Sequence, residues 1–150
     1  MAVRPAGIGS DLSAAAAVAG NRVQIDPVGI VIYCTELGIS MNAAPNSTLV
    51  PVEYILTRRS TIGTGTAGTA VKIQKASSAA LVSTVQVENT VDGTLVDTLH
   101  RWFVPVVSGV IWVAAPNREP DCGAAEFIGV GNVTTLGASI NATCYMVWEE

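Results

Sequence analysis

The only histidine is the first residue to consider for chemistry, because His100 follows Asp97 by three positions in the segment DTLHRWF. A histidine oriented by an aspartate can act as a general base for a nucleophile. In a strand, however, residues three apart point to opposite faces, so these side chains meet only where a turn intervenes. No nucleophile elbow or other catalytic serine motif is present. We therefore expect His100 to be partly buried or at an interface, and we predict that the protein is not an enzyme.

A glycine-rich segment, STIGTGTAGTAV (60–71), matches the spacing of a dinucleotide-binding loop. Gly63, Gly65 and Gly68 have the G-x-G-x-x-G spacing, and Glu88 follows twenty residues after the last glycine. Such a loop must open a helix, whose free N–H groups bind the pyrophosphate. The residues that follow, TAVKIQK, instead alternate apolar and polar side chains as a strand does. We interpret the segment as a loop between two strands and expect no cofactor.

Three carboxylates stand close together in NREPDCGAAE, at Glu119, Asp121 and Glu126. Carboxylate oxygens are the ligands of hard cations such as Ca²⁺. These three lack the regular ligand spacing of a known cation loop, and the segment contains a proline and a glycine. We expect a solvated loop and no metal site.

The cysteines, Cys34, Cys122 and Cys144, lie far apart and show no C-x-x-C spacing. This pattern excludes a sequence-recognisable zinc site. We expect three small buried thiols, and the sequence leaves open the alternative of one disulfide with the third cysteine outside it.

Trp102, Trp112 and Trp148 are the largest aromatic side chains. They could form a flat surface for sugars, but packing in the core or at an interface is the expected role. Three N-x-[ST] sequons also occur, at Asn46, Asn132 and Asn141. We give them little weight, because Asn and Thr are plentiful in this chain and such matches arise by chance.

The composition restricts the partners of the chain. Of its 150 residues, 49% are hydrophobic and only 13% are charged, and the net charge is −4. The eight basic residues are scattered apart from Arg58-Arg59, so nucleic acid is not an expected partner. The longest apolar stretch, 102–115, is too short to span a membrane. So little charge suggests that other subunits cover part of the surface, although the many small residues are a simpler explanation.

From Arg22 onward, apolar runs of strand length alternate with turn residues, and no sustained helical period occurs. This pattern predicts one all-β domain, an antiparallel β-sandwich, over residues 21–150. VDGT (91–94) and VSGV (107–110) are candidate hairpin turns. The predicted strands are 22–25, 28–34, 49–57, 69–75, 80–88, 94–99, 101–107, 109–115, 126–131 and 139–148.

Residues 1–20 differ from the rest of the chain, since they are small and Ala-rich with few large apolar side chains. We expect an extended N-terminal arm that contributes little to the core and becomes ordered on contact with a neighbouring protein.

The core of the sandwich is predicted from strand alternation, on the premise that one face of each strand fills it. The predicted buried positions are Val31, Tyr33, Val52, Ile55, Val71, Ile73, Val85, Val87, Phe103, Val104, Ile111, Trp112, Ile128, Cys144 and Met146.

Two stretches carry a resemblance to a known family. TRRSTIGTGTAGTAVKIQKASSAALVSTVQVENT (57–90) and GVGNVTTLGASINATCYMVWEE (129–150) resemble the small jelly-roll decoration, or cement, proteins on the heads of tailed bacteriophages. The resemblance covers most of 22–150 and has no single diagnostic residue. It implies a homotrimeric jelly roll, a structural virion protein on the outer capsid surface that is made in the host cytoplasm and binds the major capsid protein.

Related β-domains also occur in phage head fibres and tail fibres. The alternative function is therefore a carbohydrate-binding or adhesin-like β-sandwich with tryptophans as sugar platforms. An exposed tryptophan beside polar groups would favour this alternative, and tryptophans buried at a three-fold contact would favour the cement protein.

The low charge and the strands that are apolar on both faces predict a homo-oligomer, and the resemblance implies a trimer. Sedimentation velocity of the isolated protein at micromolar concentration should therefore show about three times the mass of the 15.5 kDa chain. A monomer under these conditions would count against the prediction for the free protein, whereas a trimer that assembles only on the capsid would not be detected in this experiment.

Overall fold

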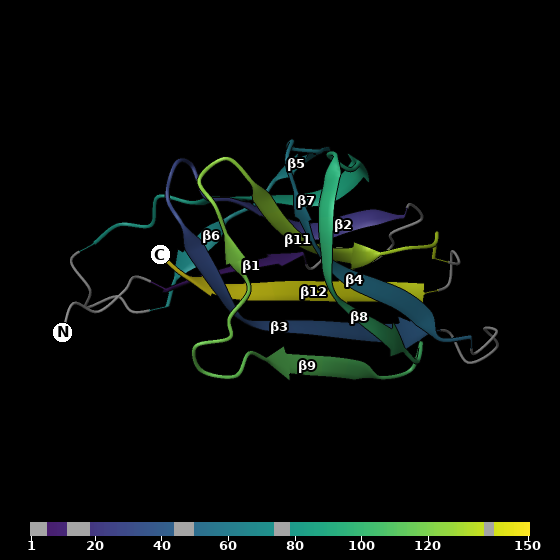
Figure 1. The fold of residues 1–150 in the computed structure, drawn as a ribbon. Helices are drawn as coiled ribbons and strands as arrows, with labels where there is room; N and C mark the ends of the chain where they lie inside the picture. Colours follow the sequence, from purple (N-terminus) through teal and green to yellow (C-terminus); the bar gives the residue numbers. More distant parts are fainter. Residues whose placement is uncertain (1–5, 12–18, 44–49, 74–78, 137–139) are drawn as a thin grey trace.

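The described part of the chain is built from β-strands. A computed structural model describes residues 6–11, 19–43, 50–73, 79–136 and 140–150, and these contain strands but no helix (Figure 1). The strands are β1 (Ala6–Asp11), β2 (Gly20–Asp26), β3 (Ile32–Ala43), β4 (Val52–Arg59), β5 (Thr64–Ala67), β6 (Ala70–Lys72), β7 (Thr84–Val91), β8 (Leu95–Val104), β9 (Gly109–Val113), β10 (Asp121–Cys122), β11 (Phe127–Asn132) and β12 (Ile140–Glu149).

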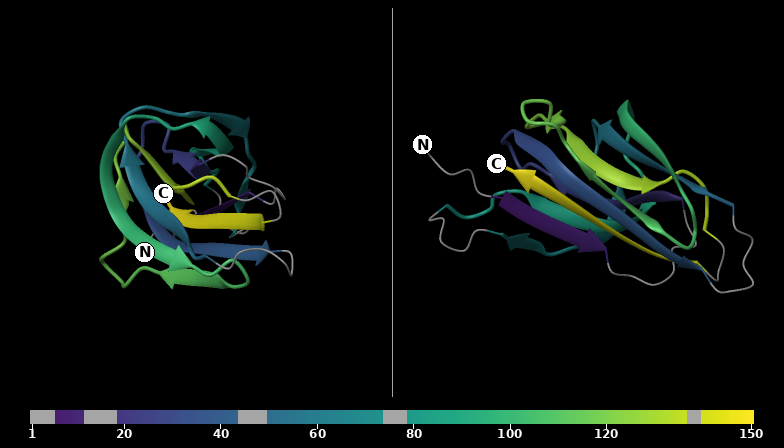
Figure 2. Two further views of the ribbon diagram at one scale, coloured as in Figure 1. Left: turned by 90° about the vertical axis from the view of Figure 1, so that its right-hand side faces the viewer. Right: turned by 90° about the horizontal axis from the view of Figure 1, so that it is seen from below.

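The strands form two sheets that lie face to face (Figure 2). Sheet A has the order β10-β3-β12-β1-β6, and β9 also pairs with β3, further along the same side as β10. Sheet B has the order β5-β7-β2-β11-β4-β8. Every pair is antiparallel. The prediction of an all-β antiparallel sandwich is confirmed, and the jelly-roll type remains a prediction.

The core lies between the sheets and is filled by alternate residues of their central strands. In β12, for example, Cys144, Met146 and Trp148 are buried and face the core, whereas the residues between them are partly exposed. Tyr54 and Leu56 of β4 face them from sheet B and are also fully buried. Burial of such side chains contributes about 1.5–3 kcal/mol each.

The predicted core list was only partly correct. Val52, Val85, Val104, Ile128, Cys144 and Met146 are buried as predicted, and four further positions are half-buried. In β3 the core contains Ile32 and Cys34 rather than their neighbours, because both faces of this segment are apolar and a shift of one residue exchanges the faces. The half-buried positions are Tyr33, Ile55, Val87 and Trp112, and the exposed ones are Val31, Val71, Ile73, Phe103 and Ile111.

The N-terminal segment also differs from the expectation of an arm outside the sandwich. Residues 6–11 form β1, an interior strand of sheet A between β12 and β6. Sequence patterning missed it because backbone hydrogen bonds, rather than large apolar side chains, place it there. Gly7 lies over the indole of Trp148, where a side chain would not fit. The rest of the predicted arm, residues 1–5 and 12–18, lies outside the described residues.

Neither predicted hairpin forms. β7 pairs with β2 and β5, whereas β8 pairs with β4 at the opposite edge of sheet B, so VDGT is a crossing connection. VSGV contains the end of the connection from β8 in sheet B to β9 in sheet A and the first two residues of β9. Turn residues alone do not distinguish a hairpin from a crossing of this kind, because both reverse the chain.

Replacing Gly7 with alanine should destabilise the sandwich. An added Cβ would lie 2.5 Å from the Trp148 ring, which is fully buried and cannot move aside without displacing the core. Overpacking of this kind costs about 1–3 kcal/mol. Urea unfolding should show this loss, whereas Gly123→Ala, whose Cβ would be in ordinary contact with the Glu126 side chain, should unfold like the wild type. Equal stability of both variants would contradict the described packing of β1 on Trp148.

Candidate interaction surface

An aromatic cluster closes one side of the sandwich, where the edge strands β8 and β9 meet. Trp102 pairs in register with Tyr54, and Trp112 with Leu37, so both indoles are on the inner faces of their sheets. His100 packs against Trp102 with ring centroids 4.3 Å apart, and the two indoles are 6.1 Å apart. His100 is exposed and the tryptophans are half-buried, so this aromatic cluster is partly open to solvent.

Large apolar side chains flank the aromatic cluster on the solvent side. Phe103, Val107, Ile111 and Val113 lie on β8, on β9 and on the connection between them, and each is 62–68% exposed. Single exposed apolar residues are ordinary. Here Phe103 lies on the outer face of sheet B, whereas Ile111 and Val113 lie on the outer face of sheet A, so large apolar side chains are exposed on both sides of the aromatic cluster. We call these four residues and the aromatic cluster the β8–β9 surface.

A depression of about 510 Å³ continues this surface over the outer face of sheet A. Ile111 lines its rim, and Gly109, Ser40, Thr143 and Tyr145 also line it. Two of its lining positions, Gly38 and Gly109, are glycines at which an added Cβ would clash. One of them, Gly38, is covered by the Tyr145 ring, which an added Cβ would strike.

The Tyr145 ring is held in place by a hydrogen bond from its hydroxyl to Glu36 Oε1 at 2.5 Å. This bond, together with partial burial and the negative charge of Glu36, raises the pKa of Tyr145 to about 12. The hydroxyl is therefore protonated at neutral pH and serves as a donor. Sequence analysis missed this pair, since only the register that places Tyr145 opposite Gly38 reveals it.

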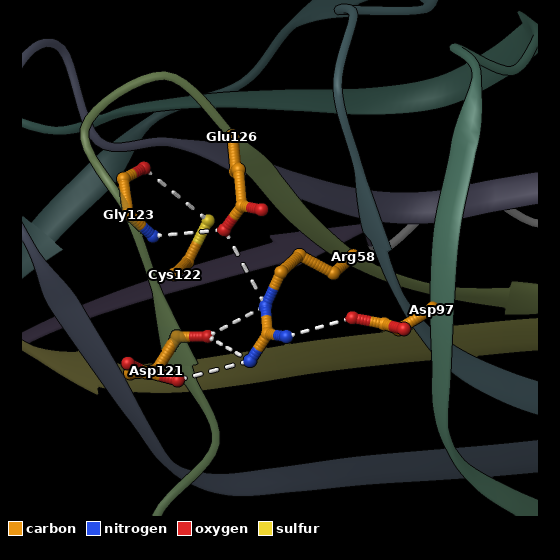
Figure 3. A network of polar contacts seen from close by, with 6 residues as sticks. All are labelled: Arg58, Asp97, Asp121, Cys122, Gly123 and Glu126. Atoms are coloured by element: carbon orange, nitrogen blue, oxygen red, sulfur yellow. Dashed lines mark hydrogen bonds and ion pairs between the residues drawn. The ribbon is translucent and has the colours of Figure 1, made fainter.

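Two of the three acidic residues of NREPDCGAAE, Asp121 and Glu126, gather around an arginine (Figure 3), whereas Glu119 accepts the backbone N–H of Asn117. Arg58, at the end of β4, donates to Asp121 O at 2.8 Å and to Asp121 Oδ1 at 2.9 Å. It also donates to Asp97 of β8 at 2.9 Å and lies 3.5 Å from Glu126. Arg58 pairs in register with buried Ile128, so it leaves sheet B on its inner side and reaches β10 of sheet A. These groups therefore neutralise an arginine that links the two sheets.

The adjacent arginine, Arg59, makes a second ion pair on the other face of β4. Its Nη2 is 2.8 Å from Asp92 Oδ2, and its Nη1 donates to Gly93 O at 2.6 Å. Asp92 also accepts the backbone N–H of Asn21 at 2.9 Å. Arg59 thus ties the connection between β7 and β8 to both β4 and β2.

No His–Asp dyad forms, since Asp97 binds Arg58. His100, which we expected to be partly buried or at an interface, is exposed and packs on the tryptophans. In the glycine-rich segment, residues 64–67 form β5 along β7 rather than a phosphate-binding turn. Gly63 and Gly65 are required there because a Cβ at either position would strike Asn89, which is buried.

All three cysteines are buried thiols, so the open question of a disulfide is answered. Burial raises the pKa of Cys34 and of Cys122 to about 12, and both thiols are protonated at neutral pH. A protonated, buried thiol is a poor nucleophile.

The sequons do not share one environment. Asn132 is buried, and its amide nitrogen donates to Thr134 O at 2.7 Å, which is incompatible with a glycan on the folded chain. Asn141 is exposed on β12, and Asn46 lies outside the described residues.

Comparison with known proteins adds no family to this picture: no protein-family model matches the chain, and no curated protein sequence is significantly similar to it. Within the described ranges, no helix has the length and apolar character to cross a membrane. The same residues contain no group of three or more His, Cys, Asp or Glu side chains arranged to hold a metal ion.

Glu150, which directly follows β12, joins this strand to the segment before β7. Its carboxylate accepts the backbone N–H groups of Val82 at 2.8 Å and Ser83 at 2.9 Å. It also accepts the Ser83 hydroxyl, which in turn accepts the Trp148 indole N–H at 2.7 Å. Burial acts to raise the pKa of Glu150, but these hydrogen bonds outweigh it and leave the pKa below its usual value.

Glu150→Gln should therefore reduce stability in a pH-dependent way. When folding lowers the pKa of a carboxyl group, the ionised carboxylate stabilises the folded state at pH values above the unfolded pKa of about 4.3. This contribution to stability is lost as the pH falls through the lowered pKa of the folded state. We expect the Tm at pH 7 to fall by about 2–4 °C, and the difference from wild type to shrink below about pH 4. Glu149→Gln is the control. A constant difference at all pH values would contradict the role of the ionised carboxylate.

Proposed function

We propose that this protein is a structural binding protein, a decoration protein of a bacteriophage capsid that attaches to the outer face of the assembled head. The observation that carries the proposal is the β8–β9 surface, where Phe103, Val107, Ile111 and Val113 are all more than 60% exposed. A chain with only 13% charged residues and with large apolar side chains exposed on both faces of this edge gains stability when another protein covers them. The resemblance of 57–90 and 129–150 to cement proteins indicates what that other protein is.

The mechanism is mass action. A protein that binds the assembled lattice of the major capsid protein and has no affinity for free subunits stabilises the lattice by an amount set by its concentration and Kd. Catalysis is not needed for this role, and the proposed partners are the major capsid protein and further copies of the chain in a trimer. The proposed location is the virion surface.

The alternative, a sugar-binding adhesin, has less support. Trp148 is fully buried and cannot be a platform for a sugar. Trp102 and Trp112 pack on each other at an interplanar angle of 68°, so they do not present one flat surface. Glycan binding by the wild-type protein, without binding to phage heads, would favour this alternative.

Removing two exposed apolar side chains should weaken attachment to phage heads without unfolding the protein. We expect Phe103→Ser/Ile111→Ser to bind heads that lack the decoration protein about 10–100-fold more weakly in co-sedimentation, since each side chain contributes about 1–2 kcal/mol at an interface. Val71→Ser/Ile73→Ser, with similarly exposed residues on the opposite side of sheet A, is the matched control. Absence of wild-type binding, or no protection of the heads against heat, would contradict the proposal.

A further inference from the structure

The free edge of β9 presents backbone groups that could bind another strand. The Ala114 N–H donates to Thr35 O, and Ser108 O accepts from the Met41 N–H, both at 2.9 Å. Backbone groups alternate in direction along an antiparallel strand, so the even-numbered residues of β9 bond to β3. The N–H and C=O groups of Gly109, Ile111 and Val113 therefore point away from β3. In the part of the chain that the structure describes, β9 pairs only with β3.

This edge lacks the features that keep sheet edges from pairing. Soluble proteins usually protect an edge with charges, prolines or irregular pairing. The other edge strands follow this rule, since β8 carries Asp97 and Arg101 and has two register shifts, β6 contains Lys72, and β5 has a register shift. β9, with the sequence GVIWV, has no charge and no proline, and its pairing with β3 is regular.

Side-chain sites lie on both faces of this edge. On the inner side, a strand added to β9 would place alternate residues beside Trp112 and the rest of the aromatic cluster, which is partly open. On the outer side, the other residues would lie beside Ile111 and Val113. One residue next to Gly109 could extend over the depression, which Gly109 and Ile111 line.

We propose that β9 receives an extended, uncharged segment of the partner protein, which adds to sheet A as a further strand. Main-chain hydrogen bonds to Gly109, Ile111 and Val113 would supply affinity, and the two flanking sites would select apolar side chains on both faces of the segment. This inference rests on the proposed function, under which the segment belongs to a capsid subunit.

A second copy of the chain is the competing occupant of this edge. Pairing of β9 with itself is a two-fold interaction, which builds dimers and not the proposed trimer. Pairing with a different edge of another copy would have to use a strand that carries charges or irregular pairing. The unprotected edge therefore fits a different protein better than a second copy.

The test compares substitutions at the β9 edge with one at the opposite edge of sheet A. Val113→Lys places a charge beside the incoming strand, whereas Val71→Lys places the same charge on β6, where the side chain is similarly exposed. Ile111→Pro removes an N–H that points away from β3, so no internal hydrogen bond is lost. Thermal unfolding should show that all three proteins remain folded.

In co-sedimentation with undecorated phage heads, we expect Val113→Lys and Ile111→Pro each to bind at least about tenfold more weakly than wild type, and Val71→Lys to bind normally. If wild type binds and the β9 variants bind equally well, the strand-addition inference is wrong while the proposed function stands. If the wild type does not bind, both fail. If Ile111→Pro instead lowers the oligomeric state in sedimentation velocity, a second copy occupies the edge and the inference is overturned.

Discussion

Two adjacent arginines at the end of β4 join parts of this sandwich that strand pairing does not connect: the crossing connections of sheet B, and sheet B with β10 of sheet A. Sheet B contains two connections that cross the same end of the sheet, from β4 to β5 and from β7 to β8. Arg59 and Asp92 form a partly buried ion pair there, with side chains 10% and 23% exposed. Gly93 lies so close to the backbone of Thr61 that a Cβ would clash, and Ser60 N–H donates to Thr94 O at 2.9 Å. The Arg58 side chain lies on the opposite face of β4 from Arg59, on the inner side of sheet B, and joins this sheet to β10 of sheet A.

This arrangement leaves one side of the molecule for binding. Arg58 occupies one end of the opening between β8 and the β9–β10 side of sheet A, where it pairs with Asp97, Asp121 and Glu126. The aromatic cluster lies in the same opening, with exposed apolar side chains beside it. β9 itself carries no charge, and Glu36, which lies beside Val113 on β3, accepts the Tyr145 hydroxyl. A chain with so few charged residues can be stable and still present an apolar edge, which is the property that the proposed capsid role needs.

Much of the fold could be predicted from the sequence, because turn residues and β-branched runs mark strands directly. The segments around 22–25, 49–57, 126–131 and 139–148 correspond closely to β2, β4, β11 and β12. The inward faces could not be predicted where both faces are apolar, as at Val31 and Ile32. β1 was missed because its place depends on backbone pairing and on the absence of a side chain at Gly7. Arg58-Arg59 stood out as the only basic pair, but its partners lie 33 to 68 positions away, and no local pattern indicates them.

The central claim, that the Arg59–Asp92 ion pair fastens the crossing connections of sheet B, is tested most directly by a double-mutant cycle in urea unfolding. Removing one member of a buried pair leaves the other charge without compensation and costs about 3–5 kcal/mol, whereas removing both avoids that penalty. The account predicts that Arg59→Met and Asp92→Asn are each strongly destabilising and that the double variant loses much less than the sum of the two. Additive losses, or single variants as stable as the wild type, would contradict it.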